Sequence, residues 1–237
     1  MDKQDINGDG VTVIVPVYNG ARTILETIGC LLDQTMRPRE IIIVDDGSTD
    51  GTSEVLAEYE ARGAITVISK PNEGKGSAVA LGIKATRGDF VVIQDADTEY
   101  DPVDIPALLT TMTQTGALAV YGSRYAGRYR KTGLFLNTIA NTILTFATNL
   151  VNNVNLSDVM TGYKLFDGRA IRAITLKSHG FEFEAEVTCK LARRGIAIYE
   201  APISYNARTY YEGKKIRVRD GWRTLSALIR YGLFGND

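Results

Sequence analysis

Two carboxylates stand one residue apart at the end of an apolar run, in Phe90-Val-Val-Ile-Gln-Asp-Ala-Asp97, and Glu99 follows two residues later. Oxygen ligands of this kind bind hard divalent cations, and Mg²⁺ or Mn²⁺ held by one or two carboxylates keeps its other coordination positions for phosphate oxygens. Asp95 and Asp97 therefore indicate a metal-assisted site for a nucleotide diphosphate. The alternative interpretation is an acidic turn that only ends a strand.

Two further polar segments also follow apolar runs. They are Pro16-Val-Tyr-Asn-Gly20 and Asp45-Asp-Gly-Ser-Thr-Asp-Gly51. The ring of Tyr18 could stack on a base, and Asp46 could accept hydrogen bonds from the imide or amino edge of a uracil or guanine. Asn-Gly and Asp-Gly-Ser are also common turn formers, so each segment taken alone is equally compatible with a plain turn.

A glycine-rich segment, Asn72-Glu-Gly-Lys-Gly-Ser77, contains residues that suit a loop around phosphate groups. Gly74 allows close approach of the backbone, and Lys75 supplies a positive charge. The spacing is neither that of a Walker A loop nor that of a dinucleotide-binding fingerprint. By itself the segment is weak evidence for phosphate binding.

The elements that must position these segments follow from the hydrophobic pattern. Short β-branched runs predict strands that are buried on both faces of a mostly parallel sheet, at 11–15, 41–44, 65–68 and 90–93. Helical spacing predicts the intervening helices at 23–32, 52–61 and 77–85. This alternation predicts an α/β fold, in which ligands bind at the carboxyl ends of the strands. The three polar segments and the two aspartates follow those ends.

Composition predicts a single domain over residues 1–237, because the chain is 44% hydrophobic and has no low-complexity tract. Cys30 and Cys189 lie far apart and are interpreted as small core residues of a reducing compartment. The polar start and the lack of an 18-residue apolar stretch predict a cytoplasmic protein that does not span a membrane. Nucleic-acid binding is not expected, because the arginines are mixed among apolar residues and form no continuous basic stripe.

Charge is divided unevenly along the chain, although the formal net charge is only −1. Residues 1–119 contain nine Lys and Arg against nineteen Asp and Glu, whereas residues 120–237 contain eighteen against nine. Chance distribution on a solvated surface is one interpretation. The other is a division of labour between an acidic half that holds a metal and a nucleotide sugar and a basic half that neutralises phosphate.

Together the motifs resemble those of the family 2 glycosyltransferases, which have the GT-A fold. The resemblance covers residues 11–231 and rests on four segments in the same order: 13–20, 44–51, 72–76 and 94–97. Within the family, the chain is most similar to dolichol-phosphate mannose synthase and related polyprenyl-phosphate glycosyltransferases. That similarity rests on the segments 95–102, 122–125, 161–166 and 207–216.

The resemblance implies a role for each matching residue. It implies that Tyr18 and Asp46 contact the base, that Asp95 and Asp97 bind the metal and diphosphate, and that Arg124 and Arg208 bind the acceptor phosphate. Glu99 stands where many mannose synthases have a metal-binding glutamine, and a carboxylate there can still ligate Mg²⁺ or Mn²⁺. Lys215, with Lys214 as the alternative, is expected at phosphate. The remaining residues expected around the nucleotide are Pro16, Asn19, Asp45, Gly74 and Lys75.

The chemistry that the resemblance implies is inverting transfer of a hexose from a GDP- or UDP-sugar to a polyprenyl or dolichyl phosphate. Positive groups near the diphosphate would stabilise the leaving group. A lipid phosphate has a second pKa of about 6 and needs no catalytic base. A sugar hydroxyl acceptor is the alternative, and Glu182, Glu184 or Glu186 could then supply a base. A non-catalytic nucleotide-sugar sensor is a more remote alternative.

Two segments bear on a lipid acceptor. Residues 132–157 contain no charged side chain and show helical apolar spacing, which is compatible with a pair of core helices or with a helix on a membrane surface. Residues 216–234 combine four arginines with Trp222 and several large aliphatic residues. This amphipathic pattern fits an anionic interface, and packing against the sheet would give a similar periodicity. Peripheral association with the inner face of the membrane is therefore expected.

Overall fold

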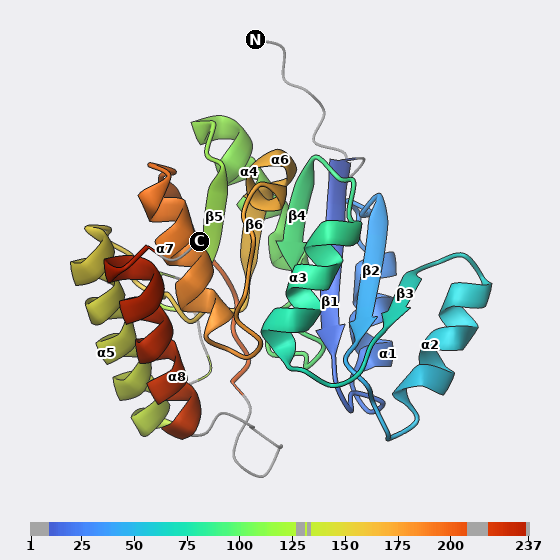
Figure 1. Ribbon diagram of the computed structural model, residues 1–237. Helices are drawn as coiled ribbons and strands as arrows, with labels where there is room; N and C mark the ends of the chain where they lie inside the picture. The colour runs from blue at the N-terminus through green and yellow to red at the C-terminus, as the bar shows by residue number, and fades with distance from the viewer. Residues whose placement is uncertain (1–9, 127–130, 132–133, 208–217, 236–237) are drawn as a thin grey trace.

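The computed structural model describes residues 10–126, 131, 134–207 and 218–235. Within them the chain forms one seven-stranded sheet in the order β3-β2-β1-β4-β6-β5-β7 (Figure 1). The strands are β1 (Val11–Val17), β2 (Glu40–Asp45), β3 (Thr66–Ser69), β4 (Phe90–Ile93), β5 (Ala119–Ser123), β6 (Lys164–Asp167) and β7 (Ile198–Pro202). Only β6 runs antiparallel to its neighbours, β4 and β5, so the sheet is mostly parallel, as the sequence predicts.

Helices cover both faces of this sheet (Figure 1). They are α1 (Ile24–Leu32), α2 (Thr52–Ala61), α3 (Lys75–Ala85), α4 (Ile105–Thr115), α5 (Phe135–Asn152), α6 (Gly168–Arg172), α7 (Phe183–Arg193) and α8 (Val218–Leu228). A short 3₁₀ turn, η2 (Pro102–Asp104), precedes α4, and a π-helical turn, η4 (Ile229–Leu233), continues α8. The four strands and three helices predicted in the first half all form, with ends that shift by up to two residues.

Alternation along β1 divides the core into two layers. Val13 and Val15 face α1, α2 and α4, whereas Ile14 faces α3, α6 and α7. Every residue of β1 is buried, which is why this strand and its neighbours appear in the sequence as continuous β-branched runs. The same β1 pairs with β2 on one side and β4 on the other, so the carboxyl ends of all three lie together.

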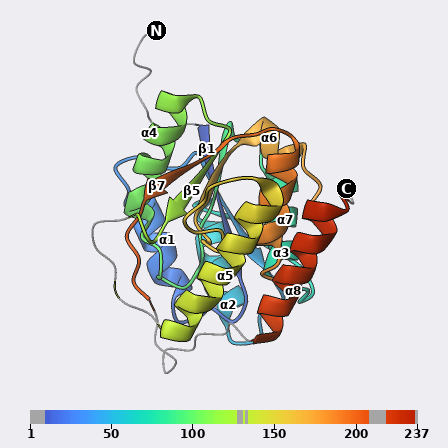
Figure 2. The same ribbon diagram turned by 90° about the vertical axis from the view of Figure 1, so that its left-hand side faces the viewer.

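An outer layer of two helices, α5 and α8, packs on α7 (Figure 2). A small apolar cluster joins the three helices, with Cys189 on α7 and Leu228 on α8 at its centre. Residues 135–152 form one continuous helix, so of the two alternatives left open for residues 132–157 the pair of core helices is wrong. No helix among the described residues is long and apolar enough to cross a bilayer.

The two cysteines differ in environment. Cys189 is buried, as predicted, but Cys30 is exposed, so its assignment to the core is wrong. Helix α1 turns Ile24, Ile28 and Leu31 toward the sheet, and Cys30 falls on the other face. Burial raises the pKa of the Cys189 thiol to about 11.

Candidate functional site

The loops after β1 and β2 are joined by hydrogen bonds at the carboxyl edge of the sheet. Asn19 has a positive φ of 51°, a conformation that Asn tolerates better than most residues. Its backbone N–H donates to Ser48 Oγ at 2.9 Å, and its Oδ1 accepts from the backbone N–H of Thr49 at 2.8 Å. Asn19, predicted to contact the nucleotide, thus holds the two loops together. Pro16, also predicted there, pairs with Val44 in the register of β1 and β2.

Two adjacent aspartates at the end of β2 have different partners. Asp45 is buried and accepts from the backbone N–H of Ser48 at 2.9 Å and from the hydroxyl of Ser53 at 2.6 Å. Asp46 accepts from the backbone N–H groups of Glu73 at 3.0 Å and Gly74 at 2.7 Å. The structure therefore gives Asp45 the role of closing its own turn, whereas Asp46 fixes the glycine-rich loop.

Lys70 completes the environment of Asp46. Its Nζ lies 2.7 Å from Asp46 Oδ1 and 3.0 Å from Glu73 Oε2. Burial alone would lower the pKa of Lys70, but hydrogen bonds to the carboxylates of Asp46 and Glu73 raise it. Tyr18, at the end of the loop from β1, leaves 44% of its surface exposed.

Lys75 begins α3 and reaches the first of the paired aspartates. Its Nζ lies 2.6 Å from Asp95 Oδ1 and 3.5 Å from Glu184 Oε1. Burial disfavours the ammonium, but attraction to Asp95 and Glu184 outweighs this effect and raises the pKa of Lys75 above its usual value. Gly74, at φ 108°, precedes the helix, and a side chain there would meet the carbonyl oxygen of His179 at 2.6 Å.

Glu184 connects Lys75 to a second, fully buried lysine. The Nζ of Lys164 donates to Glu184 Oε2 and to the carbonyl oxygens of Val159, at 3.1 Å, and Thr161. Burial lowers the pKa of Lys164 despite its carboxylate partner. The sequence Thr161-Gly-Tyr-Lys164 thus places a chain of alternating charges, Lys164 to Glu184 to Lys75 to Asp95, beneath the site.

Asp97 and Glu99 follow Asp95 but their side chains differ in surroundings. Asp97 is half-buried, and its Oδ1 accepts from the backbone N–H of Glu99 at 3.2 Å. Thr98, at φ 56°, turns the chain between them. Glu99 is buried and accepts from the Tyr205 hydroxyl at 3.1 Å. Among the described residues, no three carboxylate, imidazole or thiol groups gather as a metal cluster, so Glu99 is not brought together with the two aspartates.

Arg124, the predicted contact of the acceptor phosphate, forms a two-pronged ion pair. Its Nε and Nη2 lie 2.6 Å and 2.7 Å from the two oxygens of Asp158, which is fully buried. The guanidinium also stands over the ring of Tyr205, 5.1 Å from its centroid. Asp158 accepts a further bond at 3.1 Å from Asn141 on α5. Arg208 and Lys215, the other predicted contacts of this phosphate, lie outside the described residues.

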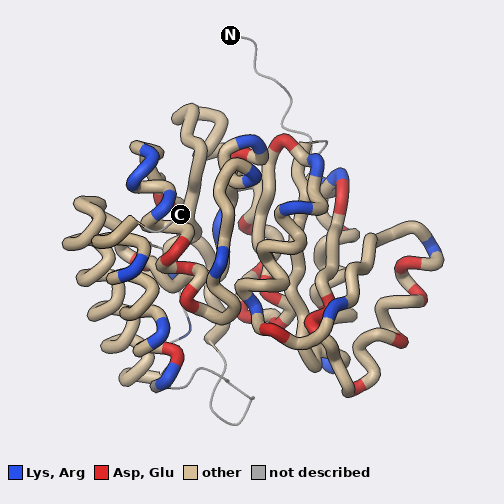
Figure 3. Tube along the Cα trace, viewed as in Figure 1, with Lys and Arg blue, Asp and Glu red and all other residues tan. Residues whose placement is uncertain are grey.

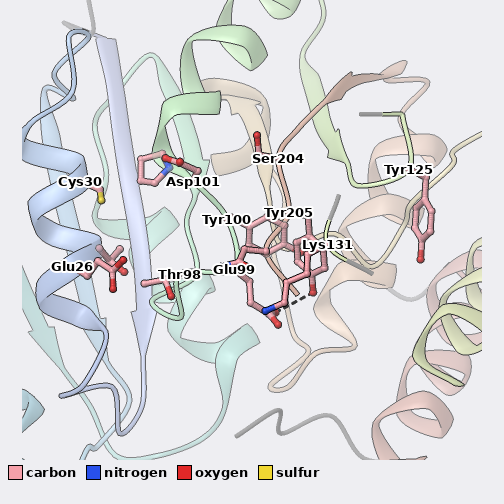
Figure 4. Close-up of a pocket in the computed structure, with 13 residues that line it drawn as sticks. Glu26, Cys30, Thr98, Glu99, Tyr100, Asp101, Tyr125, Lys131, Ser204 and Tyr205 are labelled. Atoms are coloured by element: carbon pink, nitrogen blue, oxygen red, sulfur yellow. Dashed lines mark hydrogen bonds between the residues drawn. The ribbon is translucent and has the colours of Figure 1, made fainter. Parts of the chain in front are cut away.

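A cavity of about 780 Å³ opens beside Glu99 and Tyr205 (Figure 4). Helix α1 contributes Glu26 and Cys30 to one side of it, and Tyr125 lies at the far side. Three carboxylates and three tyrosine rings are among its lining residues: Glu26, Glu99, Asp101, Tyr100, Tyr125 and Tyr205. Such a lining can accept hydrogen bonds from hydroxyls and stack on a sugar ring.

Comparison with known sequences decides the family. Residues 12–175 match the family described as Glycosyl transferase family 2. The chain belongs to this family.

Two relatives of this family 2 chain come from Haloferax volcanii. Glycosyltransferase AglJ is 30% identical over 201 residues, which cover 84% of this chain and 64% of AglJ. The low-salt glycan biosynthesis hexosyltransferase Agl6 is 29% identical over 224 residues, or 92% of this chain and 53% of Agl6. The chain thus spans less than two thirds of the length of either relative. An uncharacterized protein of Methanocaldococcus jannaschii is 28% identical over 97% of this chain and 95% of its own length.

Solved structures share the fold of this family 2 chain. Glucosyl-3-phosphoglycerate synthase from Mycobacterium tuberculosis, in complex with Mn²⁺, UDP-glucose and phosphoglyceric acid, superposes with a TM-score of 0.71 at 21% identity. The match covers 92% of this chain and 78% of the synthase. The same synthase with Mg²⁺ and UDP gives a TM-score of 0.71 at 20% identity. The fold is therefore α/β with a mostly parallel sheet, of the GT-A type.

The donor set of this family 2 chain fits a hard divalent cation. Asp95 and Asp97 offer carboxylate oxygens at the carboxyl edge of the sheet, and Asp95 already has a cationic partner in Lys75. Mg²⁺ commonly uses one or two carboxylates and completes its coordination with water and phosphate oxygens. Gly162 keeps this place open, because a Cβ there would overlap Asp95 Oδ2 and lie 3.1 Å from Lys75 Nζ.

Several residues of the site were not found from the sequence. Lys164 stands in a recognised motif, but nothing in the pattern shows that it pairs with Glu184. Asp158 has no local signal, since its partner Arg124 is 34 residues away. Tyr100, whose hydroxyl accepts from the backbone N–H of Gly162 at 3.0 Å, stacks on Tyr163 with ring centroids 5.4 Å apart. The sequence indicated these contacts of Tyr100 only by placing an aromatic residue next to the acidic motif.

Proposed function

We propose that this chain is a metal-dependent, inverting glycosyltransferase that moves a hexose from a GDP- or UDP-sugar to a polyprenyl or dolichyl phosphate. Family membership supports sugar transfer. The ion pair of Lys75 with Asp95 supports a diphosphate site, because it places a positive side chain next to the proposed metal ligands. In this proposal residues 1–119 hold the donor, and residues 120–237 hold the acceptor.

One observation favours a phosphate acceptor over a hydroxyl acceptor. Two of the three glutamates considered as bases are buried and already engaged: Glu184 pairs with two lysines, and Glu186 binds Lys190 at 3.0 Å and the backbone N–H of Ser178 at 2.7 Å. Both oxygens of each of these two carboxylates already accept hydrogen bonds. An acceptor that is already ionised needs no such base.

The chain's own residues have distinct roles in this reaction. Tyr18 stacks on the base, and Asp46 holds the loop that brings Gly74 and Lys75 to the diphosphate. Asp95 and Asp97 would hold Mg²⁺ or Mn²⁺, which supplies positive charge at the leaving group when bound. As the bond to the anomeric carbon breaks, Lys75 stabilises the negative charge on the departing nucleoside diphosphate.

The acceptor side depends on Arg124. Asp158 fixes its guanidinium by two hydrogen bonds, and one edge of a planar guanidinium can still donate to a phosphate oxygen. Arg208 and Lys215 would add positive charge for the same phosphate. An oxygen of the acceptor phosphate attacks the anomeric carbon directly, from the side opposite the leaving group. This single displacement inverts the configuration of that carbon. The reaction is expected at the inner face of a membrane, where such lipids reside.

A second candidate is transfer to a sugar hydroxyl, and the cavity beside Glu99 favours it. Its lining suits a glycan better than a phosphate, because Glu26, Glu99 and Asp101 carry three negative charges against the single positive charge of Lys131. Glu182, half-buried with Oε1 3.1 Å from the backbone N–H of Gly180, is the least engaged of the three glutamates. In this candidate function it would be the base.

Transfer of radiolabel separates these possibilities. Labelled GDP- and UDP-sugars are incubated with the protein, Mg²⁺ or Mn²⁺ and a short-chain polyprenyl phosphate, and the products are extracted into organic solvent. We expect metal-dependent label in the organic phase, lost in Asp97→Asn and kept in Glu58→Gln, a matched control at an exposed acid of α2. Label on a soluble glycan would establish the hydroxyl acceptor instead. Nucleotide-sugar binding without any transfer would indicate a sensor.

A further inference from the structure

Helix α5 packs inward with buried polar residues beside Leu144, Ala147 and Val151, and it exposes its largest apolar residues outward. Phe135, Leu136, Phe146 and Leu150 expose between 69% and 76% of their surfaces. By contrast, Asn141, Thr145 and Thr148 on the opposite side are 1–7% exposed. A helix on the surface of a globular protein normally has the reverse arrangement. The outward side of α5 therefore has a partner other than the core of this chain.

The exposed residues form one stripe along the helix. Leu136, Ile139, Ile143, Phe146 and Leu150 recur at alternating spacings of three and four residues. Helix α5 contains no charged residue over all of its 18 positions, and it is uniformly tan in Figure 3. A contiguous apolar stripe of this length marks an interaction site.

Helix α8 lies beside α5 and continues the same outer layer (Figure 2). Trp222 on α8 and Ile229 and Leu233 on its continuation η4 are exposed at spacings of seven and four residues, and Trp222 exposes 67% of its surface. Three exposed arginines flank these apolar residues, against one half-exposed acid, Asp220 (Figure 3). They are Arg219, Arg223 and Arg230. Together, the stripe on α5 and these residues of α8 and η4 are called the α5–α8 surface.

We infer that the α5–α8 surface binds an anionic lipid bilayer, with the apolar stripe in the acyl boundary and the arginines at the headgroups. This inference rests on the proposed function, which needs a lipid acceptor. An uncharged apolar stripe with an adjacent cationic row and an interfacial tryptophan has the chemistry of helices that lie in a membrane surface. Lipid phosphates would compensate the arginine charges.

A second copy of the chain is a less suitable occupant. A two-fold interface pairs the same surface of both copies, so it would bring two sets of three arginines together with only two copies of Asp220 to compensate them. Like charges facing each other at an interface oppose association. A bilayer with negative headgroups has the opposite charge to this surface.

The inner side of α5 connects the proposed membrane surface to the acceptor site. Asn141 Nδ2 donates to Asp158 Oδ1 at 3.1 Å and to the hydroxyl of Tyr125 at 3.3 Å. Asp158 in turn holds Arg124, the proposed contact of the acceptor phosphate. A bilayer on the outer side of α5 would thus lie one helix thickness from the residues that receive a lipid headgroup.

Vesicle binding tests the inference without donor or acceptor. The protein is floated with vesicles of phosphatidylcholine mixed with phosphatidylglycerol, and with vesicles of phosphatidylcholine alone. Wild type is expected to bind the mixed vesicles. The triple variant Ile143→Ser/Phe146→Ser/Leu150→Ser is expected to bind the mixed vesicles at least roughly tenfold more weakly. Burial of even one large apolar side chain in the bilayer contributes about a tenfold factor in affinity. The control Val103→Ser, at an apolar residue of η2 that is 62% exposed, should bind as wild type does.

The arginines are tested separately. Arg219→Gln/Arg223→Gln is expected to weaken binding to mixed vesicles severalfold and to reduce its dependence on salt. Thermal unfolding and the stabilisation by GDP or UDP should match wild type in both variants, because all the substituted residues are exposed. Those two measurements show that a loss of vesicle binding is not a loss of folding.

The outcomes distinguish the surface from the reaction. No wild-type binding to mixed vesicles, or equal binding by the triple serine variant, overturns the α5–α8 surface even if sugar is transferred to a dispersed polyprenyl phosphate. Vesicle binding with no transfer contradicts the proposed function and leaves the surface supported. A wild-type dimer in analytical ultracentrifugation that the triple serine variant abolishes, together with no vesicle binding, assigns the surface to a second copy.

Discussion

Lys75 Nζ lies 2.6 Å from Asp95 Oδ1, so the lysine of the glycine-rich loop is paired with the first carboxylate of the acidic motif. Both groups come from the carboxyl edge of the sheet, where α3 begins and β4 ends. The ammonium thus sits beside a carboxylate proposed to hold a cation. We infer that Lys75 moves from Asp95 toward the diphosphate when metal and donor bind.

Substitution of Lys75 tests this exchange. Lys75→Met is expected to lower turnover by about 10²–10³, because leaving-group charge is no longer stabilised. The same substitution should increase the affinity for Mn²⁺ in the absence of nucleotide, since Asp95 loses its competing cation. Calorimetric titration measures that affinity. Lys84→Met, at an exposed lysine of the same helix, is the matched control. Weaker Mn²⁺ binding in Lys75→Met would contradict the exchange.

The charge of Lys75 should persist over the working pH range. Its folded-state pKa is raised, so the stability from its ion pairs is fully present below the unfolded-state pKa of about 10.4. That stability is lost only as the pH rises through the still higher folded-state pKa. Denaturation of wild type and Lys75→Met is therefore expected to show a constant difference between pH 7 and 9. A difference that shrinks across this interval would contradict the assignment.

Gly162 is expected to be necessary for the acidic site. In Gly162→Ala the new methyl group would overlap Asp95 Oδ2, so the Asp95 carboxylate must move, and with it its ion pair with Lys75. Activity and Mn²⁺ affinity should both fall at least tenfold. Gly29→Ala in α1 meets nothing within 4 Å and is expected to be neutral, or to stabilise the fold by up to about 1 kcal/mol. Normal Mn²⁺ binding by Gly162→Ala would show that Asp95 is not a ligand.

The buried pair of Lys164 and Glu184 predicts a coupling in stability. Lys164→Met leaves the buried Glu184 with a single, more distant cation, and Glu184→Gln leaves Lys164 without its carboxylate. Each single change is expected to cost about 3–5 kcal/mol in the free energy of unfolding. The double variant should cost less than the sum of the two. Denaturant unfolding of the four proteins gives the coupling, and strict additivity would exclude the pair.

The pH dependence of transfer distinguishes an ionised acceptor from an enzymatic base. With a lipid phosphate, the acidic limb should follow the second ionisation of the acceptor at a pKa of about 6. Glu182→Gln should leave that limb unchanged. Under the hydroxyl-acceptor alternative, the limb would belong to the enzyme, and the rate in Glu182→Gln would fall by 10²–10⁴. Rate profiles of the two proteins decide between these results.

The sequence predicted the sheet and the meeting of the loops for a physical reason. Buried parallel strands require continuous β-branched runs, and the ends of such strands share one edge, so Tyr18, Asp46 and Asp95 were expected together. The hydrogen bonds of Asp46 to the backbone N–H groups of Glu73 and Gly74 were not predictable. A carboxylate can accept hydrogen bonds equally well from a nucleotide base and from backbone N–H groups. The contact between Lys75 and Glu184 was also not predictable, because the two residues are 109 positions apart in the sequence.

The outer helices show a different limit of prediction from sequence. Helical periodicity in residues 132–157 indicated an apolar side but not whether that side faces the core or the outside. In the structure the side with Leu136, Ile143 and Phe146 is exposed, and Asn141, Thr145 and Thr148 are buried on the inner side. The prediction that Cys30 is a core residue was wrong for a similar reason. Cys30 stands among apolar residues of α1, but the buried side of that helix consists of Ile24, Thr27, Ile28 and Leu31.

The most direct test of the account compares a polyprenyl phosphate with the corresponding unphosphorylated polyprenol as acceptors, with one labelled nucleotide sugar and Mn²⁺. The account predicts labelled lipid from the phosphate and none from the alcohol, with Arg124→Lys raising the KM for the phosphate more than that for the donor. Labelled lipid from the alcohol at a comparable rate would contradict attack by an ionised phosphate. Label on neither lipid, with release of a nucleoside diphosphate to a soluble glycan, would contradict the lipid acceptor itself.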